Sequence, residues 1–550
     1  MSVELLGITL VRMITTSDLN LSFSSKTLFQ SVNIKFLPGN CYGLIGANGA
    51  GKSTLLKVIS GEILPTEGSV ILDKNLKLSV LKQDQFAYDS FPILDTVIMG
   101  YKALYDCYKR RMDLYAKGEL SEKEGEEIGE LEDLYAEMDG YRFESDAARM
   151  LCDLGIGENK HDLLMSEMQS AEKLKILLAQ ALFAEPDILL LDEPTNQLDY
   201  HSILWLEEYL LNFKNTVIVV SHDRHFLNKV CTHIADVDYG QVRIYPGNYD
   251  FWKEASELVQ KQRNDKADKD AKKIEQLESF VRRFSANASK SKQATSRKKL
   301  IEKLRPEELP VSTRRAPFID FKAKRSVGNR VMTIKGLNAS IEEKILYKDL
   351  NFEVSKGDKI AIISEDSLAK TALLAQLGQE TETCEGVIKI GESVTMAYCP
   401  KNNNSYFEND LSLLDWLQQY SQGHESQVIR GFLGRMLFSG EEVNKRASVL
   451  SGGEKARAMF SKMMLKEPNT LIFEEPTDHL DLESISALNS ALEQYNECII
   501  FCSHDMQLLN TVANRIIEIF PTGYIDHRSN FEEYLNNPNV QKKRLSLMPQ

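Results

Sequence analysis

The residues best suited to chemistry in this chain form a glycine-rich segment near its start. Residues 46–53, GANGAGKS, match the pattern G-x-x-x-x-G-K-[ST]. Glycines at these positions let backbone N–H groups approach the phosphates of a nucleotide, and the lysine reaches the β- and γ-phosphates. We therefore expect ATP to be bound by Gly46, Ala47, Asn48, Gly49, Ala50, Gly51, Lys52, Ser53 and Thr54.

Two acidic residues farther along the first half are placed for the metal and the water of ATP hydrolysis. The apolar run 188–191 ends at Asp192, and Glu193 follows it directly. In phosphate-loop ATPases a loop hydroxyl and an aspartate hold Mg²⁺, and a polar group orients the attacking water. We therefore expect Ser53 and Asp192 to bind Mg²⁺ and Glu193 to act as the catalytic carboxylate.

Three further side chains complete the expected nucleotide site. His222 follows the apolar run 217–220, where a catalytic imidazole can reach the γ-phosphate. Gln83 also follows a predicted strand and is expected to contact the metal and the water. Phe23 is expected to stack on adenine. Apolar strands that lead into these motifs predict a P-loop α/β core.

The motifs occur a second time, so the chain contains an internal repeat. LLLDEPT at 189–195 returns as LIFEEPT at 471–477. The offset is 318 residues at the phosphate loop (364 − 46) and 282 at the later motifs (475 − 193). The first half therefore holds 36 extra residues, between Gln83 and Gln169.

These extra residues have the pattern of a helical hairpin. Apolar spacing indicates helices over 96–115 and 121–138, with a turn around Lys117-Gly118. We expect this arm, at about 92–141, to stand out from the first domain. A longer helical subdomain with a solvated, charged surface remains the alternative.

A charged segment connects the two halves. Residues 253–280 are rich in Lys, Asp, Glu and Gln, as in a long exposed helix. The next stretch, 281–301, holds seven Lys or Arg residues and no acidic residue. A flexible, solvated tether would explain such a charge run. In a protein with a net charge of −14, however, the stretch favours contact with nucleic-acid phosphates.

The motif order resembles that of ATP-binding-cassette (ABC) ATPases, and LSGGE at 450–454 resembles their signature loop. Two cassettes in one chain, no membrane domain and an interdomain linker resemble the ABC-F family in particular. YPGNYDFW at 245–252 and FVRRFSANASKSKQATSR at 280–297 are most similar to the bacterial YbiT-like subgroup. The resemblance covers about residues 14–536.

This resemblance implies an α/β protein with two tandem P-loop ABC nucleotide-binding domains, each with a helical subdomain, joined by a long helical linker. It also implies an ATP hydrolase that binds the ribosome near the tRNA exit site, contacts rRNA and tRNA through the linker, and regulates translation. The ATPase subunit of a membrane transporter is the alternative. The expected bounds are 1–250 for the first ABC domain with its arm, 251–330 for the linker, 331–538 for the second, degenerate ABC domain and 539–550 for a C-terminal tail.

In ABC proteins each ATP lies between the phosphate loop of one cassette and the signature of the other, which predicts two unequal sites. Site one joins the first phosphate loop to the second signature, and all its elements are present. Glu454 replaces the glutamine that is commoner at the end of the signature. The signature residues expected to contact ATP in site one are Ser451, Gly452, Gly453 and Glu454.

Site two joins the second phosphate loop to the first signature, and both are degraded. The loop at 364–371 is SEDSLAKT, and the signature at 169–172 is QSAE. Side chains replace glycines that would permit a positive φ, and two acidic residues lie where phosphates should be. Ile341, Lys401 and Glu474 replace the adenine-stacking, metal-sensing and metal-binding residues. We expect no ATP turnover here, while static binding stays open for Lys370, Thr371, Glu474, Glu475 and His504.

Composition limits the remaining possibilities. No apolar run approaches the ~18–20 residues that span a bilayer, and the first residues lack the basic start and cleavage site of a signal peptide. The eight cysteines have no C-x-x-C spacing, which argues against zinc and disulfides and favours a reducing cytoplasm. We expect a cytoplasmic monomer whose two cassettes pair with each other, without a membrane partner.

Overall fold

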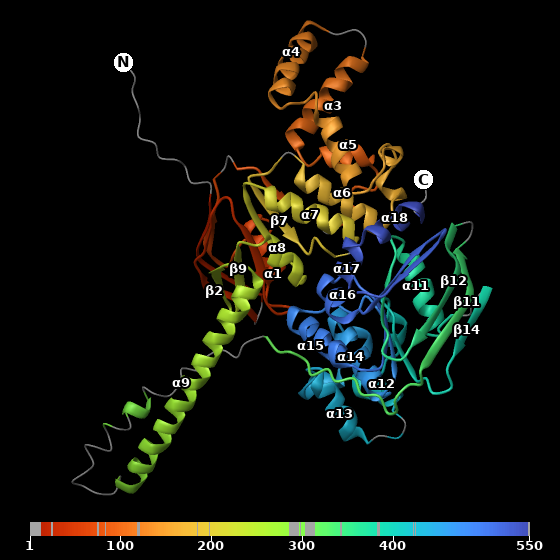
Figure 1. Ribbon diagram of the computed structural model, residues 1–550. Coiled ribbons are helices and arrows are strands. Elements are labelled where there is room, and N and C mark those ends of the chain that lie inside the picture. Colours follow the sequence, from red (N-terminus) through yellow and green to blue (C-terminus); the bar gives the residue numbers. More distant parts are fainter. Residues whose placement is uncertain are drawn as a thin grey trace.

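The computed structural model contains two α/β cassettes, as the internal repeat predicts (Figure 1). Each cassette has one large, mostly parallel sheet and one small antiparallel sheet. The structure describes residues 13–23, 26–73, 76–82, 84–117, 121–183, 185–196, 198–284, 296, 299–302, 314–341, 344–381, 385–421, 423 and 425–547.

The large sheet of the first cassette brings the expected catalytic motifs to one edge. Its spatial order is β10 (Gln241–Pro246), β9 (His233–Asp238), β4 (Cys41–Ile45), β8 (Thr216–Val220), β7 (Ile188–Asp192) and β6 (Leu78–Val80). Strands β4, β8 and β7 are parallel neighbours with almost wholly buried residues, because apolar packing covers both faces. Their carboxyl ends therefore lie side by side. The small sheet consists of β1 (Ile14–Phe23), β2 (Lys26–Val32), β3 (Lys35–Phe36) and β5 (Glu67–Ile71).

The large sheet of the second cassette repeats this order strand for strand. Its large sheet has the order β15 (Met396–Cys399), β16 (Thr470–Glu474), β17 (Cys498–Cys502), β13 (Lys359–Ile363), β18 (Arg515–Phe520) and β19 (Gly523–His527). Its small sheet consists of β12 (Lys344–Ser355), β11 (Arg330–Ile341) and β14 (Glu385–Ile390). The repeated order confirms the predicted fold of two tandem cassettes.

Helices cover the sheets and form the helical subdomains. Those of the first cassette are α1 (Lys52–Ile59), α2 (Ile93–Ile98), α5 (Phe143–Asp153), α6 (Ser170–Leu182), α7 (Tyr200–Asn212) and α8 (Arg224–Val230). Those of the second are α11 (Ser367–Leu377), α12 (Leu413–Gln418), α13 (Ser426–Arg435), α14 (Gly452–Leu465), α15 (Leu482–Gln494), α16 (Met506–Val512), α17 (Phe531–Asn536) and α18 (Pro538–Leu547).

Two helical elements project from the body in opposite directions (Figure 1). One is the pair α3 (Lys102–Ala116) and α4 (Glu122–Glu137), joined by the bidentate ion pair of Arg110 and Glu127. The other is the long helix α9 (Tyr249–Phe284). None of the helices in the described part of the chain combines the length and apolar character needed to cross a membrane.

The expectation of one helix over 96–115 is wrong, because the chain breaks between α2 and α3. Gly100 lies at the break, where a Cβ atom would be 2.0 Å from the carbonyl oxygen of Gln180 in α6. The chain therefore approaches the backbone of α6 too closely for any side chain at this position. This contact ends α2 and redirects the chain into α3.

The cassettes interpenetrate where the first turns of α7 and α15 begin. Leu482 of α15 belongs to the apolar core of the first cassette and is 1% exposed. Tyr200 of α7, 282 positions earlier, packs against the core of the second cassette and meets Phe531 edge to face. The interface therefore has approximate two-fold symmetry, and equivalent residues can be compared across it.

Candidate functional site

The first phosphate loop connects β4 to α1 in a conformation that depends on its glycines. Gly46, Gly49 and Gly51 have φ values of 158°, 76° and 99°. A Cβ atom on Gly51 would lie 2.7 Å from the ring of Phe29, whereas no atom lies within 4 Å of the place a Cβ would take on Gly49. The loop is therefore open at Gly49 and closely packed at Gly51, as a backbone cradle for an anion requires.

The start of α1 fits a bound phosphate group. Its N-cap residue, Gly51, supplies no side-chain acceptor to the first amides of the helix. Such amides, together with the helix dipole, attract anions. The buried Lys52 ammonium donates to the carbonyl oxygens of Gly46 at 2.8 Å and Ala47 at 3.2 Å, so it is held inside the loop. Ser53 is exposed beside it, where its hydroxyl is accessible to a metal ion.

The expected catalytic residues meet at the ends of β7 and β8. Asp192 is the last residue of β7, and the next residue, Glu193, has a φ of 50°. The Glu193 carboxylate accepts a hydrogen bond from the backbone N–H of His222 at 3.3 Å, and its other oxygen lies 3.2 Å from His222 Nε2. His222 Nδ1 is buried without a hydrogen-bond partner among the described residues. A buried polar atom of this kind fits a site that is completed by a ligand.

Burial sets the protonation of this group. It raises the pKa of the Glu193 carboxyl, with the neighbouring Asp192 adding to the effect, although Lys52 opposes it. Burial also lowers the pKa of His222 to about 3, so the imidazole is neutral at pH 7. Burial also lowers the pKa of Lys52, although the charges of Glu193, Asp481 and Glu483 oppose this effect.

Two residues expected in this site cannot be placed with the others. Gln83 lies outside the described residues. Phe23 ends β1, but its side chain is likewise outside the description. The expected roles of Gln83 at the metal and Phe23 at the adenine therefore stay predictions.

The second cassette contributes to the first phosphate loop across the interface. Asn48 Nδ2 donates to the carbonyl oxygen of His479 at 3.2 Å. A Cβ atom on Gly453 would lie 2.7 Å from that oxygen and 3.8 Å from Asn48 Nδ2. The signature residue Gly453 and the phosphate-loop residue Asn48 therefore both lie beside the carbonyl group of His479. His479 was not identified from the sequence. The available signal was its position, because it directly follows the residues Pro476-Thr477-Asp478 after the repeated glutamate Glu475.

The signature is held in place by its own capping box. Ser451 accepts a hydrogen bond from the backbone N–H of Glu454, and the Glu454 carboxylate accepts one from the N–H of Ser451 at 2.8 Å. Lys445 also pairs with Glu454 at 3.2 Å. A capping box uses either glutamate or glutamine at this position, so Glu454 can serve in place of the commoner glutamine. Ser451 and Gly452 remain exposed at the start of α14.

The second phosphate loop has a different backbone. None of residues 364–371 has a positive φ, and α11 begins at Ser367, three residues earlier than α1 when the repeats are aligned (367 − 318 = 49). The expected obstruction of left-handed positions is therefore wrong in detail, because Ser367 and Ala369, which align with Gly49 and Gly51, lie in the first turn of α11. Asp366 caps this helix by accepting from the N–H of Leu368 at 3.0 Å, and it pairs with Lys344.

The remaining charged groups of the second site neutralise one another. Lys370 Nζ lies 3.3 Å from Glu475 Oε1, which also lies 3.0 Å from His504 Nε2. Thr371, the equivalent of Ser53, donates its hydroxyl hydrogen bond to Glu474. Burial, the largest single effect, lowers the pKa of Lys370, but the Glu475 carboxylate together with Cys502 and Glu474 raises it overall. Burial lowers the pKa of His504 to about 4.

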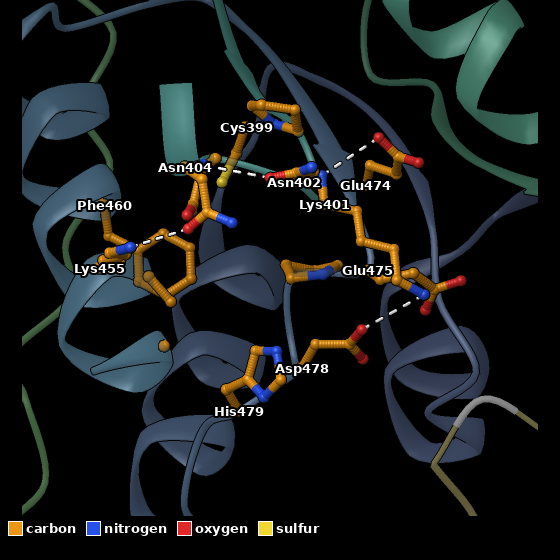
Figure 2. Close-up of a pocket in the computed structure, with 15 residues that line it drawn as sticks. Cys399, Lys401, Asn402, Asn404, Lys455, Phe460, Glu474, Glu475, Asp478 and His479 are labelled. Atoms are coloured by element: carbon orange, nitrogen blue, oxygen red, sulfur yellow. Dashed lines mark hydrogen bonds and ion pairs between the residues drawn. The ribbon is translucent and has the colours of Figure 1, made fainter. Parts of the chain in front are cut away.

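A lysine stands where the first cassette has its expected metal-sensing glutamine. Figure 2 shows Lys401 beside a cavity, with its backbone N–H donating to Glu474 at 3.1 Å and its ammonium 3.5 Å from Asp478. The lysine therefore brings a positive charge to the acidic end of β16.

The comparisons with known proteins agree with this architecture. A family model described as an ABC transporter matches residues 29–196 and 347–478, and another with the same description matches residues 235–321. The chain is 52% identical over 537 residues to the ABC transporter ATP-binding protein YkpA of Bacillus subtilis (strain 168), covering 97% of this chain and 99% of that one. It is 46% identical over 531 residues to the probable ATP-binding protein YbiT of Escherichia coli O157:H7, covering 96% and 100%.

More distant proteins share the tandem arrangement. The ABC transporter F family member 2 of Arabidopsis thaliana is 30% identical over 542 residues, covering 96% of this chain and 80% of that one. The solved structure of an RNase-L inhibitor has the same fold, with a TM-score of 0.58, 16% identity and coverage of 96% and 93%. The predicted resemblance is confirmed: this chain belongs to the ABC-F family of tandem ATP-binding-cassette ATPases and is similar to YbiT.

Proposed function

We propose that this protein hydrolyses ATP at one composite site only, which joins the first phosphate loop to the second signature. The observation that carries the proposal is the hydrogen bond from Asn48 to His479 next to Gly453. Asn48 belongs to an intact phosphate loop and Gly453 to an intact signature, which supports a site shared by the two cassettes. The open backbone at Gly49 and the uncapped start of α1 support ATP as the ligand.

Within this site each side chain has a distinct task. Lys52 and the loop amides bind phosphate oxygens, and Glu193 orients the attacking water. His222 is neutral and can donate or accept a hydrogen bond beside Glu193. Ser53 and Asp192 would hold Mg²⁺, which when bound supplies positive charge to the phosphate oxygens. Ser451 and the signature glycines close the site from the second cassette.

The second site is proposed to be without turnover. Its helix start is capped by Asp366, and its lysine is paired with Glu475. A phosphate group would have to displace the first contact and compete with the second. It would also meet the negative charge of Asp366 at the start of α11, where a helix otherwise favours an anion.

We further infer that closure on ATP acts on the ribosome and thereby regulates translation. The support is membership of the ABC-F family and the acid-free basic stretch 281–301 in a chain of net charge −14. Lys and Arg that contact phosphates release counterions, so such a stretch gives salt-dependent binding to rRNA or tRNA. A cytoplasmic monomer is proposed, because both halves of the composite site come from one chain. Four of the seven basic residues, Lys290, Lys292, Arg297 and Lys298, lie outside the described residues.

Co-sedimentation with ribosomes tests this proposal. Glu193→Gln protein in ATP is expected to pellet with ribosomes, and the amount should fall as salt rises. A linker variant should bind weakly and lose most of this salt dependence, while its basal ATPase is unchanged. This variant replaces with Gln the residues Arg282, Arg283, Lys290, Lys292, Arg297, Lys298 and Lys299.

A matched variant removes the same number of charges elsewhere. It replaces with Gln the exposed lysines Lys35, Lys57, Lys214, Lys322, Lys466, Lys542 and Lys543. This control should pellet like its parent. Undiminished pelleting of the linker variant across the salt series would reject the nucleic-acid role and favour a plain tether. Binding to membrane vesicles rather than ribosomes would support the transporter subunit instead.

A further inference from the structure

A largely buried arginine connects the end of the interdomain segment to both cassettes. Arg314 donates to Asp236 of β9 in the first cassette at 2.5 Å and to Glu483 of α15 in the second at 2.9 Å. Its side chain is 14% exposed. Buried charge-assisted hydrogen bonds of this geometry are strong, and breaking one leaves the partner uncompensated.

The start of the same segment reaches the same place. Trp252, in the first turn of α9, donates from its indole nitrogen to the other oxygen of Asp236 at 3.2 Å. The Arg314 guanidinium lies over the Trp252 ring, 4.6 Å from its centre. The two ends of the segment, 62 positions apart (314 − 252), therefore meet on one carboxylate. Any movement of either end relative to the first cassette disturbs this contact.

This cluster lies directly beside the first phosphate loop. Asp236 is paired in the sheet with Ile45, the residue that precedes Gly46. The next residue of β9, Val237, is so close that its carbonyl oxygen would be 2.6 Å from a Cβ atom on Gly46. Glu483 is the second residue of α15, shortly after His479, whose carbonyl oxygen accepts from Asn48. The arginine thus joins the two elements that enclose site one.

The second cassette has an equivalent cluster beside the second loop. Arg544 of α18 donates to Glu518 of β18 at 3.0 Å and to His201 of α7 at 3.1 Å. Tyr534 donates to Glu518 at 2.6 Å. The partners of the two arginines correspond at the offset of 282, as 236 and 518, 201 and 483, and 252 and 534. After each cassette, therefore, the chain provides an arginine that contacts residues of both cassettes across the interface.

The two clusters differ in their charge and in their chain connection. Arg314 has a carboxylate on both sides of the interface, whereas Arg544 has Glu518 on one side and a histidine on the other. Because an arginine can only donate, His201 Nε2 must accept, which requires the neutral ring. The first cluster also holds both ends of the interdomain segment, Trp252 and Arg314, while the second holds the C-terminal helix.

We propose that Arg314 is a positioning residue that couples closure of site one to the placement of the interdomain segment. When site one is closed, Arg314 contacts Glu483, and Arg314 in turn fixes the segment at Trp252 and Asp236. Arg544 is its structural counterpart at site two and has no part in turnover. The proposal rests on the assignment of hydrolysis to site one.

The test compares Arg314→Met with Arg544→Met in the full-length protein. ATPase kinetics should show kcat/KM lowered about tenfold or more for Arg314→Met, with partial rescue by Arg314→Lys. Arg544→Met should stay within about twofold of the parent. Combining Arg314→Met with Glu483→Gln should cost no more than Arg314→Met alone, because both remove one interaction.

A second measurement reports on the segment itself. In the Glu193→Gln background, ATP should change the rate of tryptic cleavage within 281–301, and Arg314→Met should abolish this change while Arg544→Met retains it. Melting temperatures of all variants are measured alongside. If Arg314→Met lowers only the melting temperature, or if cleavage in the Glu193→Gln parent does not respond to ATP, the coupling is rejected. If Glu193→Gln alone leaves turnover intact, the assignment of hydrolysis to site one fails instead.

Discussion

The two phosphate-loop segments, 46–53 and 364–371, leave equivalent strands and then follow different paths. In the first, three glycines with positive φ form an open cradle before α1 begins at Lys52. In the second, α11 begins at Ser367 and includes the positions that align with Gly49 and Gly51. The backbone of segment 46–53 therefore suits an anion, whereas in segment 364–371 the side chain of Asp366 already caps the start of the helix.

One aligned pair shows the difference most clearly. Asn48 and Asp366 occupy the same place in the two loops (366 − 318 = 48). Asn48 donates across the interface to the other cassette, whereas Asp366 turns back to cap its own helix. The change from an amide donor to a carboxylate acceptor removes a contact between cassettes and creates one within a cassette.

The two phosphate-loop lysines, Lys52 and Lys370, also differ in their surroundings. Lys52 is held by backbone carbonyl groups, and burial lowers its pKa, whereas the close contact with Glu475 raises the pKa of Lys370. The glutamates follow the opposite trend, since burial raises the pKa of Glu193 while His504 and Lys370 lower that of Glu475 against the effect of burial. The same residue types therefore form a lysine–glutamate–histidine cluster in the second cassette, whereas in the first Lys52 contacts backbone carbonyl groups and Glu193 contacts His222.

The largest expected effect separates the two glutamates. Glu193→Gln should slow ATP turnover by about 10²–10³-fold, because the water-orienting carboxylate is lost while the phosphate loop is intact. The protein should then accumulate in the closed, ATP-bound state. Glu475→Gln should change turnover far less, since Glu475 pairs with Lys370 in the site that is closed internally. Steady-state phosphate release measures both variants, and equal losses would contradict the difference between the sites.

A second substitution tests how the halves are paired. Ser451→Arg places a long cation at the exposed start of α14, next to the glycine that faces Asn48, and should lower turnover on the order of 10²-fold by misplacing ATP. Ala171 is exposed in the first signature, where it aligns with Gly453 (453 − 282 = 171), and Ala171→Arg should stay within about twofold. ATPase rates at saturating ATP provide the measurement. A greater loss from Ala171→Arg would mean that the signatures are paired with the wrong loops.

The elements that the sequence predicted well are those with local patterns. Apolar runs ending in Asp192 and His222 identified the strand ends, and the repeat predicted two cassettes. The helix at 96–115 was predicted wrongly, because its periodicity continues through Gly100 although the backbone of α6 approaches too closely there. For the second loop, the sequence predicted the loss of the phosphate cradle. It did not predict that a helix starting at Ser367 would replace the cradle. Asp366 before a run of good helix formers was the overlooked signal of a helix start.

The contacts between cassettes could not be predicted from patterns. Arg314 lies 78 positions from Asp236, and Arg544 lies 26 positions from Glu518, so the two arginines do not align even though their partners do. The hydrogen bond from Asn48 reaches a backbone carbonyl group, for which no residue type is required. Only the folded chain brings these groups together.

The two glutamates should also affect stability with opposite signs. The folded-state pKa of Glu193 is raised to about 8 from 4.5, so its contribution to stability is present at low pH and is lost as the pH rises between these values. Glu193→Gln should therefore raise the melting temperature by a few degrees at about pH 8.5 and by less at about pH 5. The control for this shift is the parent protein scanned in the same buffers.

Glu475 behaves in the reverse way in the same experiment. Its folded-state pKa is lowered, so its ionised form contributes stability above 4.5, and this contribution is lost as the pH falls through the lowered value. Glu475→Gln should lower the melting temperature at both pH values, because Lys370 then loses its buried partner. Shifts of the same sign in the two variants would mean that the charge balance of the two sites is alike.

The smallest expected effect concerns the aligned pair of loop residues. Asp366→Ala removes the cap of α11 and the ion pair with Lys344, which should destabilise the second cassette by about 1 kcal/mol. ATP turnover should be unchanged, because site one contains no part of α11. Asn48→Ala should have the opposite profile, with stability nearly unchanged and kcat/KM for ATP lowered by roughly 2- to 10-fold, as for the loss of one hydrogen bond. Urea unfolding and ATPase kinetics on the two variants provide the comparison. If Asp366→Ala lowered turnover while Asn48→Ala lowered only stability, the division into an open loop and a self-capped loop would be reversed.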